Sequence, residues 1–113
     1  MNIHIDNEDS LTMAKISGEI GVDGARQLTD ELRDLACGDG ATLAVDLSEL
    51  QAIDSSGLSA LIDLVARSRL SGGRVILASP SSFVRGVLEV TRLDGWFDIC
   101  DNLAQARQRL VSE

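Results

Sequence analysis

Two short apolar runs constrain the fold more than any other feature of this chain. They are Thr-Leu-Ala-Val-Asp-Leu at 42–47 and Arg-Val-Ile-Leu-Ala-Ser at 74–79. Runs that do not alternate with polar residues are typical of strands covered on both faces. Between them, apolar residues recur at helical spacing from Leu58 to Val65, and Gly72-Gly73 ends that helix. A strand, a helix and a second strand predict a parallel pair joined by a right-handed crossover.

The first residues of the chain predict an antiparallel hairpin. Ile3–Ile5 alternates weakly, Asn7–Ser10 is a polar turn, and a second strand is expected over Leu11–Ser17, with Leu11 and Met13 on one side. Gly18–Gly21 is expected to form a loop.

Further helices are predicted where apolar residues lie three or four positions apart. Asp23 is expected to cap the first of these helices, Pro80–Ser82 opens another, and Asp101 caps the last. The apolar positions are Ala25, Leu28, Leu32 and Leu35; Phe83, Val84, Val87 and Leu88; and Leu103, Ala106, Leu110 and Val111. A connection with Leu93, Trp96, Phe97 and Ile99 is expected to close the core.

These elements predict an α/β protein with one domain over residues 1–113. Its sheet is expected to be mixed and four- to five-stranded, with an N-terminal antiparallel hairpin and about four helices. The 113 residues fit a single domain with one core. No apolar run approaches the ~20 residues of a membrane span, and the N-terminus lacks the pattern of a signal peptide.

The charge balance is acidic. Ten Lys and Arg residues face eighteen Asp and Glu residues, which gives a formal net charge of −8. Nucleic acid and anionic membranes need a basic surface, so neither is an expected partner. A protein with a basic patch suits this charge better.

Few side chains are suited to catalysis or metal binding. The chain has one histidine, His4, and two cysteines, Cys37 and Cys100. These are too few for a disulfide framework or a zinc site, and a reducing cytoplasm is the expected compartment. We expect a non-enzymatic protein with no cofactor and no metal.

The segment Asp54-Ser55-Ser56-Gly57 is the strongest candidate for a functional site. It follows a predicted strand and begins a helix, the edge at which open α/β sheets place their sites. Asp and Ser also cap helices in general, so ordinary capping is the alternative. If Ser55 is the N-cap, Ser56 takes the first helical position with the freer hydroxyl. Gly57 would then leave Ser56 open to a partner.

This segment resembles the signature of the STAS domain in its anti-sigma factor antagonist form. The matching stretch runs from Asp46-Leu47-Ser48 through Ile53–Leu58 to Leu61. Gly18-Glu19-Ile20 is similar to the Gly-Glu-Leu loop of that family, and Gly72–Leu77 is similar to its last strand. Leu88, Thr91, Leu93 and Phe97-Asp98-Ile99 resemble the exit of its third helix. The resemblance covers nearly the whole chain.

The resemblance implies a regulatory module that binds an anti-sigma factor, which is itself a serine kinase. In the free form such a protein captures the kinase. Phosphorylation of the second serine, here Ser56, releases the kinase, and a PP2C-type phosphatase resets the module. Ser55 is the alternative phosphorylation site. The expected partner-binding residues are Glu19, Gly21, Asp23, Asp54, Ser55, Gly57, Leu58, Ser59 and Asp63.

One position departs from the family pattern. Many antagonists have Asp after the Gly-Glu-Leu triplet, whereas this chain has Gly21, with Asp23 two residues later. Ser56, Ala60, Asp63 and Arg67 fall along one helical stripe, which is either a solvated face or a docking stripe. Ile20, Val22 and Leu58 are candidates for a small apolar centre of the partner surface.

Three other functions are compatible with parts of the pattern. The same fold serves as a ligand- or nucleotide-binding sensor domain, and as a structural STAS subunit of a lipid-transport ABC complex. A small hydrolase has almost no catalytic side chains here. The intact Asp-Ser-Ser-Gly motif favours the antagonist, and a monomer is expected.

Overall fold

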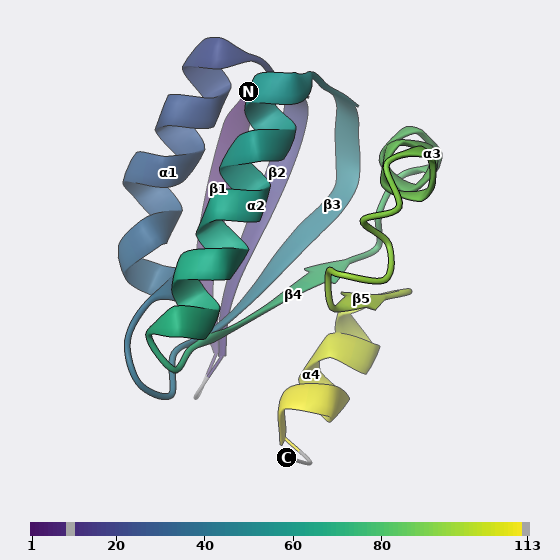
Figure 1. Cartoon of the computed structure of the whole chain (residues 1–113). Helices are drawn as coiled ribbons and strands as arrows, with labels where there is room; N and C mark the ends of the chain where they lie inside the picture. The colour runs from purple at the N-terminus through teal and green to yellow at the C-terminus, as the bar shows by residue number, and fades with distance from the viewer. Residues whose placement is uncertain (9–10, 112–113) are drawn as a thin grey trace.

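A computed structural model describes residues 1–8 and 11–111 of the chain (Figure 1). The predicted turn at Asn7–Ser10 includes Asp9 and Ser10, which lie outside the described residues, as does the side chain of Val111. The elements are β1 (Asn2–Glu8), β2 (Leu11–Ile20), α1 (Val22–Ala36), β3 (Thr42–Ile53), α2 (Ser55–Leu70), β4 (Arg74–Ala78), α3 (Ser82–Val90), β5 (Ile99–Cys100) and α4 (Leu103–Val111). None of the helices in this part of the chain combines the length and apolarity that a membrane crossing requires.

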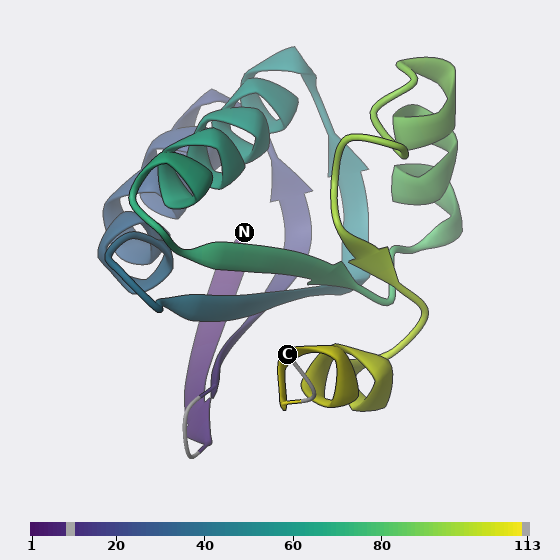
Figure 2. The same ribbon diagram turned by 60° about the horizontal axis from the view of Figure 1, so that its bottom comes forward.

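The strands form one mixed sheet in the order β1-β2-β3-β4-β5. The hairpin β1–β2 is antiparallel, and β2, β3, β4 and β5 pair in parallel. Figures 1 and 2 show α1 and α2 side by side on one face of the sheet and α4 on the opposite face. Successive right-handed crossovers place α1 and α2 on the same face. The predicted fold class and N-terminal hairpin are confirmed.

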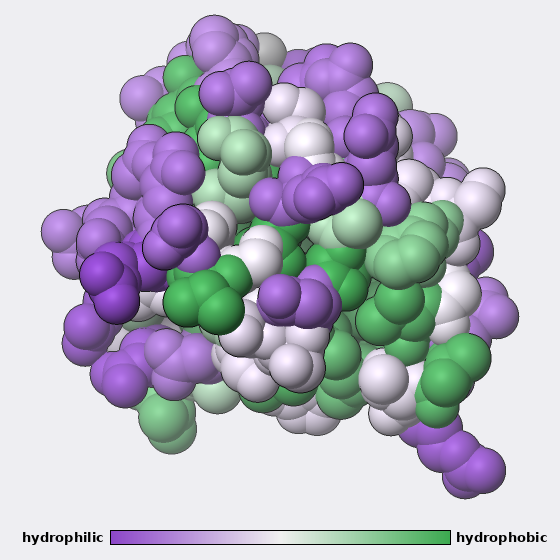
Figure 3. Space-filling view, turned by 90° about the horizontal axis from the view of Figure 1, so that it is seen from above, coloured by the Kyte–Doolittle hydropathy of each residue, from purple (hydrophilic) through white to green (hydrophobic). Residues whose placement is uncertain are grey.

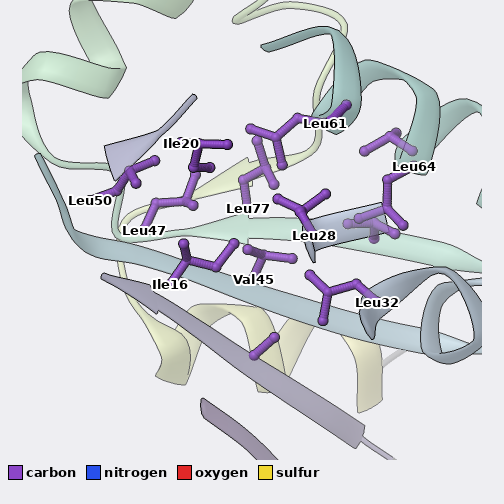
Figure 4. Packing of buried hydrophobic residues seen from close by; sticks show 14 of the residues in the cluster. Ile16, Ile20, Leu28, Leu32, Val45, Leu47, Leu50, Leu61, Leu64 and Leu77 are labelled. Atoms are coloured by element: carbon purple, nitrogen blue, oxygen red, sulfur yellow. The ribbon is translucent and has the colours of Figure 1, made fainter. Parts of the chain in front are cut away.

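The central strands are buried on both faces, as the apolar runs predict. Leu43, Val45 and Leu47 of β3 belong to the large core between the sheet and helices α1 and α2. Figure 4 shows the leucines of these helices pointing toward that face of the sheet. The alternate residues Ala44 and Ile76 face the other way, toward the side chains of α4. Because successive side chains of a strand point to opposite faces of the sheet, one apolar run supplies buried residues to both faces.

The second and third strands are longer than the sequence predicts. Gly18–Ile20 was expected to be a loop, and 48–53 lay beyond the predicted strand. In the structure Gly18 pairs with Leu50, and Ile20 pairs with Ile53. Each segment lacks a strong alternating pattern, and the pairing between the two segments decides their conformation. The two-residue strand β5 was likewise not predicted as a separate element.

Two expected helix caps are wrong. Helix α1 begins after Gly21, whose extended backbone is the N-cap, so Asp23 lies inside the first turn. At α4, the side chain of Asn102 accepts a hydrogen bond from the Gln105 N–H at 2.8 Å, and Asp101 precedes this cap. Ser81 caps α3 through the Val84 N–H, as expected for the Pro80–Ser82 segment.

A buried hydroxyl joins the ends of α1 and α2. The Ser68 side chain is fully buried, and its Oγ donates to the Ala36 carbonyl oxygen at 2.6 Å. Ala36 is the last residue of α1, so its carbonyl has no acceptor role inside the helix. The contact therefore fixes the two helices against each other at the end opposite the Asp-Ser-Ser-Gly segment.

We expect Ser68→Ala to lower the free energy of unfolding by about 1–3 kcal/mol, because the Ala36 carbonyl then stays buried without a partner. Urea unfolding followed by circular dichroism measures this. Ser59→Ala removes an exposed hydroxyl from the same helix and should have an effect below about 0.5 kcal/mol. Equal stability of the two variants would show that water replaces the hydroxyl.

Candidate functional site

The ends of β2 and β3 bring two distant segments of the chain together. The Asp54 N–H donates to the Ile20 carbonyl oxygen at 3.1 Å, directly after these strands end. Helix α1 starts beside this bond after Gly21, and helix α2 starts after Asp54. Glu19, Asp23 and Asp54 are all exposed at this edge of the sheet. The structure thus gathers the expected loop residues and the Asp-Ser-Ser-Gly segment at one place.

Asp54, and not Ser55, is the N-cap of α2. Its backbone is extended, and its Oδ1 accepts a hydrogen bond from the Gly57 N–H at 3.0 Å. Its carbonyl accepts the first helical bond, from the Leu58 N–H at 2.9 Å. The conditional assignment of Ser55 as cap is therefore wrong. A carboxylate at this position satisfies one first-turn N–H and also suits the positive end of the helix.

The two serines occupy the first and second helical positions. Ser55 is exposed, whereas Ser56 is half-buried, so the hydroxyl of Ser56 is not the freer of the two. The N–H groups of both residues belong to the first turn and have no acceptor inside the helix. Both hydroxyls therefore lie where a helix favours negative charge, including that of a phosphoryl group.

Gly57 is required by packing against β2. A Cβ atom built on Gly57 would lie 2.7 Å from both the carbonyl oxygen and the Cγ2 of Ile20. The carbonyl belongs to the strand backbone and cannot move aside cheaply. The missing side chain of Gly57 thus has a packing role that the sequence did not predict, because it lets the first turn of α2 lie directly on Ile20.

Gly21 tolerates a side chain. Its φ of −106° is accessible to any residue, and a Cβ atom there would lie 3.5 Å from Asp54 Oδ2, an ordinary contact. The backbone at position 21 thus has room for the Asp that many antagonists carry there, although the carboxylate of that Asp would lie next to Asp54.

The acids at this edge have no cationic partner within residues 1–8 and 11–111. Glu19, Asp23 and Asp54 form no ion pair there. Two other acids of the neighbouring elements do have cationic partners: Glu49 pairs with Lys15 at 3.1 Å and Asp63 with Arg67 at 2.9 Å. The site is therefore left with three uncompensated negative charges around two hydroxyls.

The helical stripe suggested for docking is interrupted. Ala60 is buried at 9% exposure, and Asp63 is held by Arg67. The suggested apolar centre also changes, because Ile20 is fully buried. Of the two remaining candidates, Val22 is 66% exposed and Leu58 is half-buried.

We expect Asp54→Ala to destabilise the protein by about 0.5–2 kcal/mol, because the Gly57 N–H loses its cap. Asp54→Asn keeps the cap while removing the charge and should stay close to wild type in thermal unfolding. The pair of variants thus separates the structural role of Asp54 from its charge. Equal melting temperatures for Asp54→Ala and wild type would contradict the capping role.

Helix α3 presents a surface that the sequence did not predict. The pattern predicts a helix with Phe83, Val84, Val87 and Leu88 as its apolar positions. Val84 and Leu88 are buried, and Val87 is half-buried against the core. Phe83 is 49% exposed and Val90 is 85% exposed. The sequence did contain an indication of this exposed surface. Apolar residues lie on both sides of this short helix, whereas a helix with one buried face needs them on one side only.

A polar pocket of about 750 Å³ separates α3 from the sheet edge. Its lining comes from β2, β3 and the start of α3: Ser17, Gly18, Ser48, Glu49, Leu50, Gln51, Ser81, Ser82 and Phe83. The Ser81 Oγ donates to the Leu50 carbonyl at 2.7 Å, which joins α3 to β3.

The cysteines and the histidine lie away from this site. Cys37 is the half-buried C-cap of α1 and His4 is exposed on β1. Burial raises the pKa of the Cys100 thiol, although the nearby Arg109 opposes that shift. Cys100 is only 3% exposed, so its thiol stays protonated and inaccessible at neutral pH. Among the described residues, no group of three or more His, Cys, Asp and Glu side chains is arranged to hold a metal ion.

Known proteins resemble this chain in sequence and in structure. A proposed anti-sigma factor antagonist of Thermotoga maritima is 33% identical over 64 residues, which are 57% of this chain and 57% of that protein. The matched region thus spans little more than half of that relative's length.

The antagonist SpoIIAA has been solved in both phosphorylation states, and both structures are similar to this one. The unphosphorylated form has a TM-score of 0.78 at 19% identity, covering 99% of this chain and 98% of SpoIIAA. The phosphorylated form, from Bacillus, has a TM-score of 0.72 at 20% identity, covering 96% and 99%. At these identities the likeness establishes the fold.

A family model described as the MlaB STAS domain matches residues 3–109. That range includes every element from β1 to the middle of α4, and the described fold contains the mixed sheet and four helices that the resemblance implies. The chain therefore belongs to the STAS domain family.

Proposed function

We propose that this protein is an anti-sigma factor antagonist, which binds a serine kinase in its unphosphorylated form and is released when Ser56 is phosphorylated. One observation carries the proposal. Two serines occupy the first turn of α2, capped by Asp54, beside acids that no described cation neutralises. Such a surface suits a partner whose basic side chains meet these acids and whose carboxylate lies opposite the serines, so that added negative charge at Ser56 repels the partner.

The physical effect of phosphorylation is local. A phosphoryl group adds about −1.5 to −2 charges at neutral pH. Against a partner carboxylate ~6 Å away, this costs on the order of 1–5 kcal/mol for effective dielectrics of ~80 to ~20. Each 1.4 kcal/mol is about tenfold in affinity. The modification therefore ends binding without a change of fold, and a PP2C-type phosphatase restores the binding form.

Different observations favour Ser56 and Ser55 as the phosphorylated residue. The resemblance to the family motif assigns the phosphorylated position to the second serine, Ser56. Burial favours Ser55, which is exposed. Helix α2 need only fray by its first turn to present Ser56 to a kinase, and first turns are the least stable part of a helix.

Incubation with ATP and a serine kinase of the histidine-kinase-like ATPase fold that binds this protein, followed by mass spectrometry, tests the proposal. We expect one phosphoryl group on Ser56. Ser56→Ala should abolish incorporation and Ser55→Ala should retain it. The reverse pattern would move the site to Ser55, and incorporation only elsewhere, or none with a kinase that binds, would refute the site.

An adaptor subunit of a lipid-transport ABC complex is the second candidate, favoured by the MlaB description of the matching family model. The two functions differ in one measurable property. An adaptor should bind its ATPase partner equally well before and after chemical or enzymatic modification at Ser56. Loss of binding on phosphorylation supports the antagonist.

A further inference from the structure

The exposed side of α3 carries an apolar stripe, which we define as Phe83, Gly86, Val87 and Val90. These positions follow i, i+3, i+4 and i+7, so they share one helical face. Together with Ser82 and Thr91 they line a groove of about 440 Å³. The opposite side of the helix, with Val84 and Leu88, packs on the core. Phe83 and Val90 are the exposed members of the stripe, whereas Val87 is half-buried and packs against the core.

We propose that the α3 stripe forms one continuous interface with the Ser56 site, and that its occupant is the kinase partner, through an apolar ridge flanked by basic side chains. This inference rests on the proposed function and adds a second contact region to it. Phosphorylation acts at one end of this interface, and apolar contact at the other supplies binding energy.

The spacing of the two regions supports a single interface. The hydroxyl of Ser81, directly before α3, donates a hydrogen bond to the Leu50 carbonyl, and Leu50 lies on β3 four residues before Asp54, which follows the end of that strand. Four extended residues span about 13 Å. A standard interface buries about 800 Å² on each partner, equivalent to a disc about 30 Å across. A partner centred on the Ser56 site therefore reaches the start of α3.

The surface of the stripe continues into the polar pocket beside the ends of β2 and β3. Ser82 and Phe83 line both the polar pocket beside β2 and β3 and the apolar groove of the stripe. Viewed from above, Figure 3 shows apolar side chains on the right, the side on which α3 lies in Figure 1. The first turn of α2 is at the top in Figure 1 and thus belongs to the same viewed face.

The apolar and acidic residues of this interface indicate the kind of partner that binds it. The stripe has no charged member, while Glu19, Asp23 and Asp54 at the other end lack cationic partners within the described residues. The complement is a surface with an apolar ridge and basic flanks. A second copy of this chain carries the same acids and would bring like charges together. A nine-residue helix is also only about 13.5 Å long, too short to supply a stable dimer interface by itself.

The test measures the dissociation constant of the kinase complex by titration calorimetry. We expect the double variant Phe83→Ala/Val90→Ser to bind at least tenfold more weakly than wild type. Because the lost contact is apolar, this ratio should stay the same between low and high salt, while the affinity of wild type itself falls with salt.

Leu70→Ser is the matched control. Leu70 is 88% exposed, close to the 85% of Val90, but it ends α2 at the far side from Ser56. We expect its binding to stay within twofold of wild type. Circular dichroism and thermal unfolding of each variant ensure that a loss of affinity is not a loss of fold.

The outcomes distinguish this inference from the proposed function. Wild-type affinity in the stripe variant, with release of the kinase on Ser56 phosphorylation, overturns the stripe alone. Absence of any binding by the wild type overturns both. A concentration-dependent dimer in sedimentation that Val90→Ser abolishes shows that a second copy occupies the stripe, and also overturns the inference.

Discussion

The Ser56→Asp protein is expected to fold as the wild type does and to bind its kinase partner about 3- to 100-fold more weakly. The range follows from one added charge ~6 Å from a partner carboxylate, which costs about 0.7–2.8 kcal/mol at dielectrics of ~80 to ~20. Ser56 lies in the first turn of α2, where an acid gains about 0.3–1 kcal/mol from the helix dipole. Repulsion from Asp54 offsets part of that gain. Calorimetry measures the affinity, and circular dichroism the fold.

Asn102→Asp is the control for net charge. It adds the same single charge at the start of α4, where Asn102 caps the Gln105 N–H and Asp caps equally well. We expect no more than a twofold change in kinase affinity, because the charge is far from the proposed interface and is screened over about 8–10 Å. An unfolded Ser56→Asp protein would contradict the local charge switch, as would equal weakening by both variants.

The Gly57→Ala protein is expected to lose about 1–3 kcal/mol of folding free energy, because the new methyl group overpacks the contact between α2 and β2. The Cβ atom would lie 2.7 Å from the Ile20 carbonyl oxygen, so the strand or the helix start must shift. For a domain of this size, that corresponds to a melting temperature lower by roughly 4–12 °C. The shift also displaces Ser55 and Ser56 from the edge of the sheet, so phosphorylation should slow as well.

Gly86→Ala is its matched control. Gly86 is also helical, but a Cβ atom there meets no atom within 4 Å. Alanine stabilises a helix position that has room for its methyl group by roughly 0.5–1 kcal/mol relative to glycine. We therefore expect opposite signs for the two Gly→Ala substitutions in thermal unfolding. Equal effects would show that the approach of α2 to Ile20 does not depend on the missing side chain.

The ends of the strands could not all be predicted from the apolar pattern. Thr42–Leu47 could be predicted because an uninterrupted apolar run reports burial on both faces. Gly18–Ile20 and 48–53 could not, since each is stabilised as strand by pairing with the other rather than by its own residues. The same holds for the cap of α2. Asp54 and Ser55 are both good N-cap residues. Asp54 takes this role because its backbone N–H donates to the carbonyl oxygen of Ile20, a contact that only the tertiary structure supplies.

The sequence by itself determined the order of the first four strands and of the four helices, the acidic charge and the Asp-Ser-Ser-Gly segment at a helix start. These depend on local spacing and residue chemistry, which one chain segment carries alone. The tertiary structure decided that Gly57 is a packing residue, that Ser55 is more exposed than Ser56, and that Phe83 and Val90 face outward. Each of these depends on which backbone or side chain lies opposite, and a strand end more than thirty residues away supplies that neighbour for Gly57.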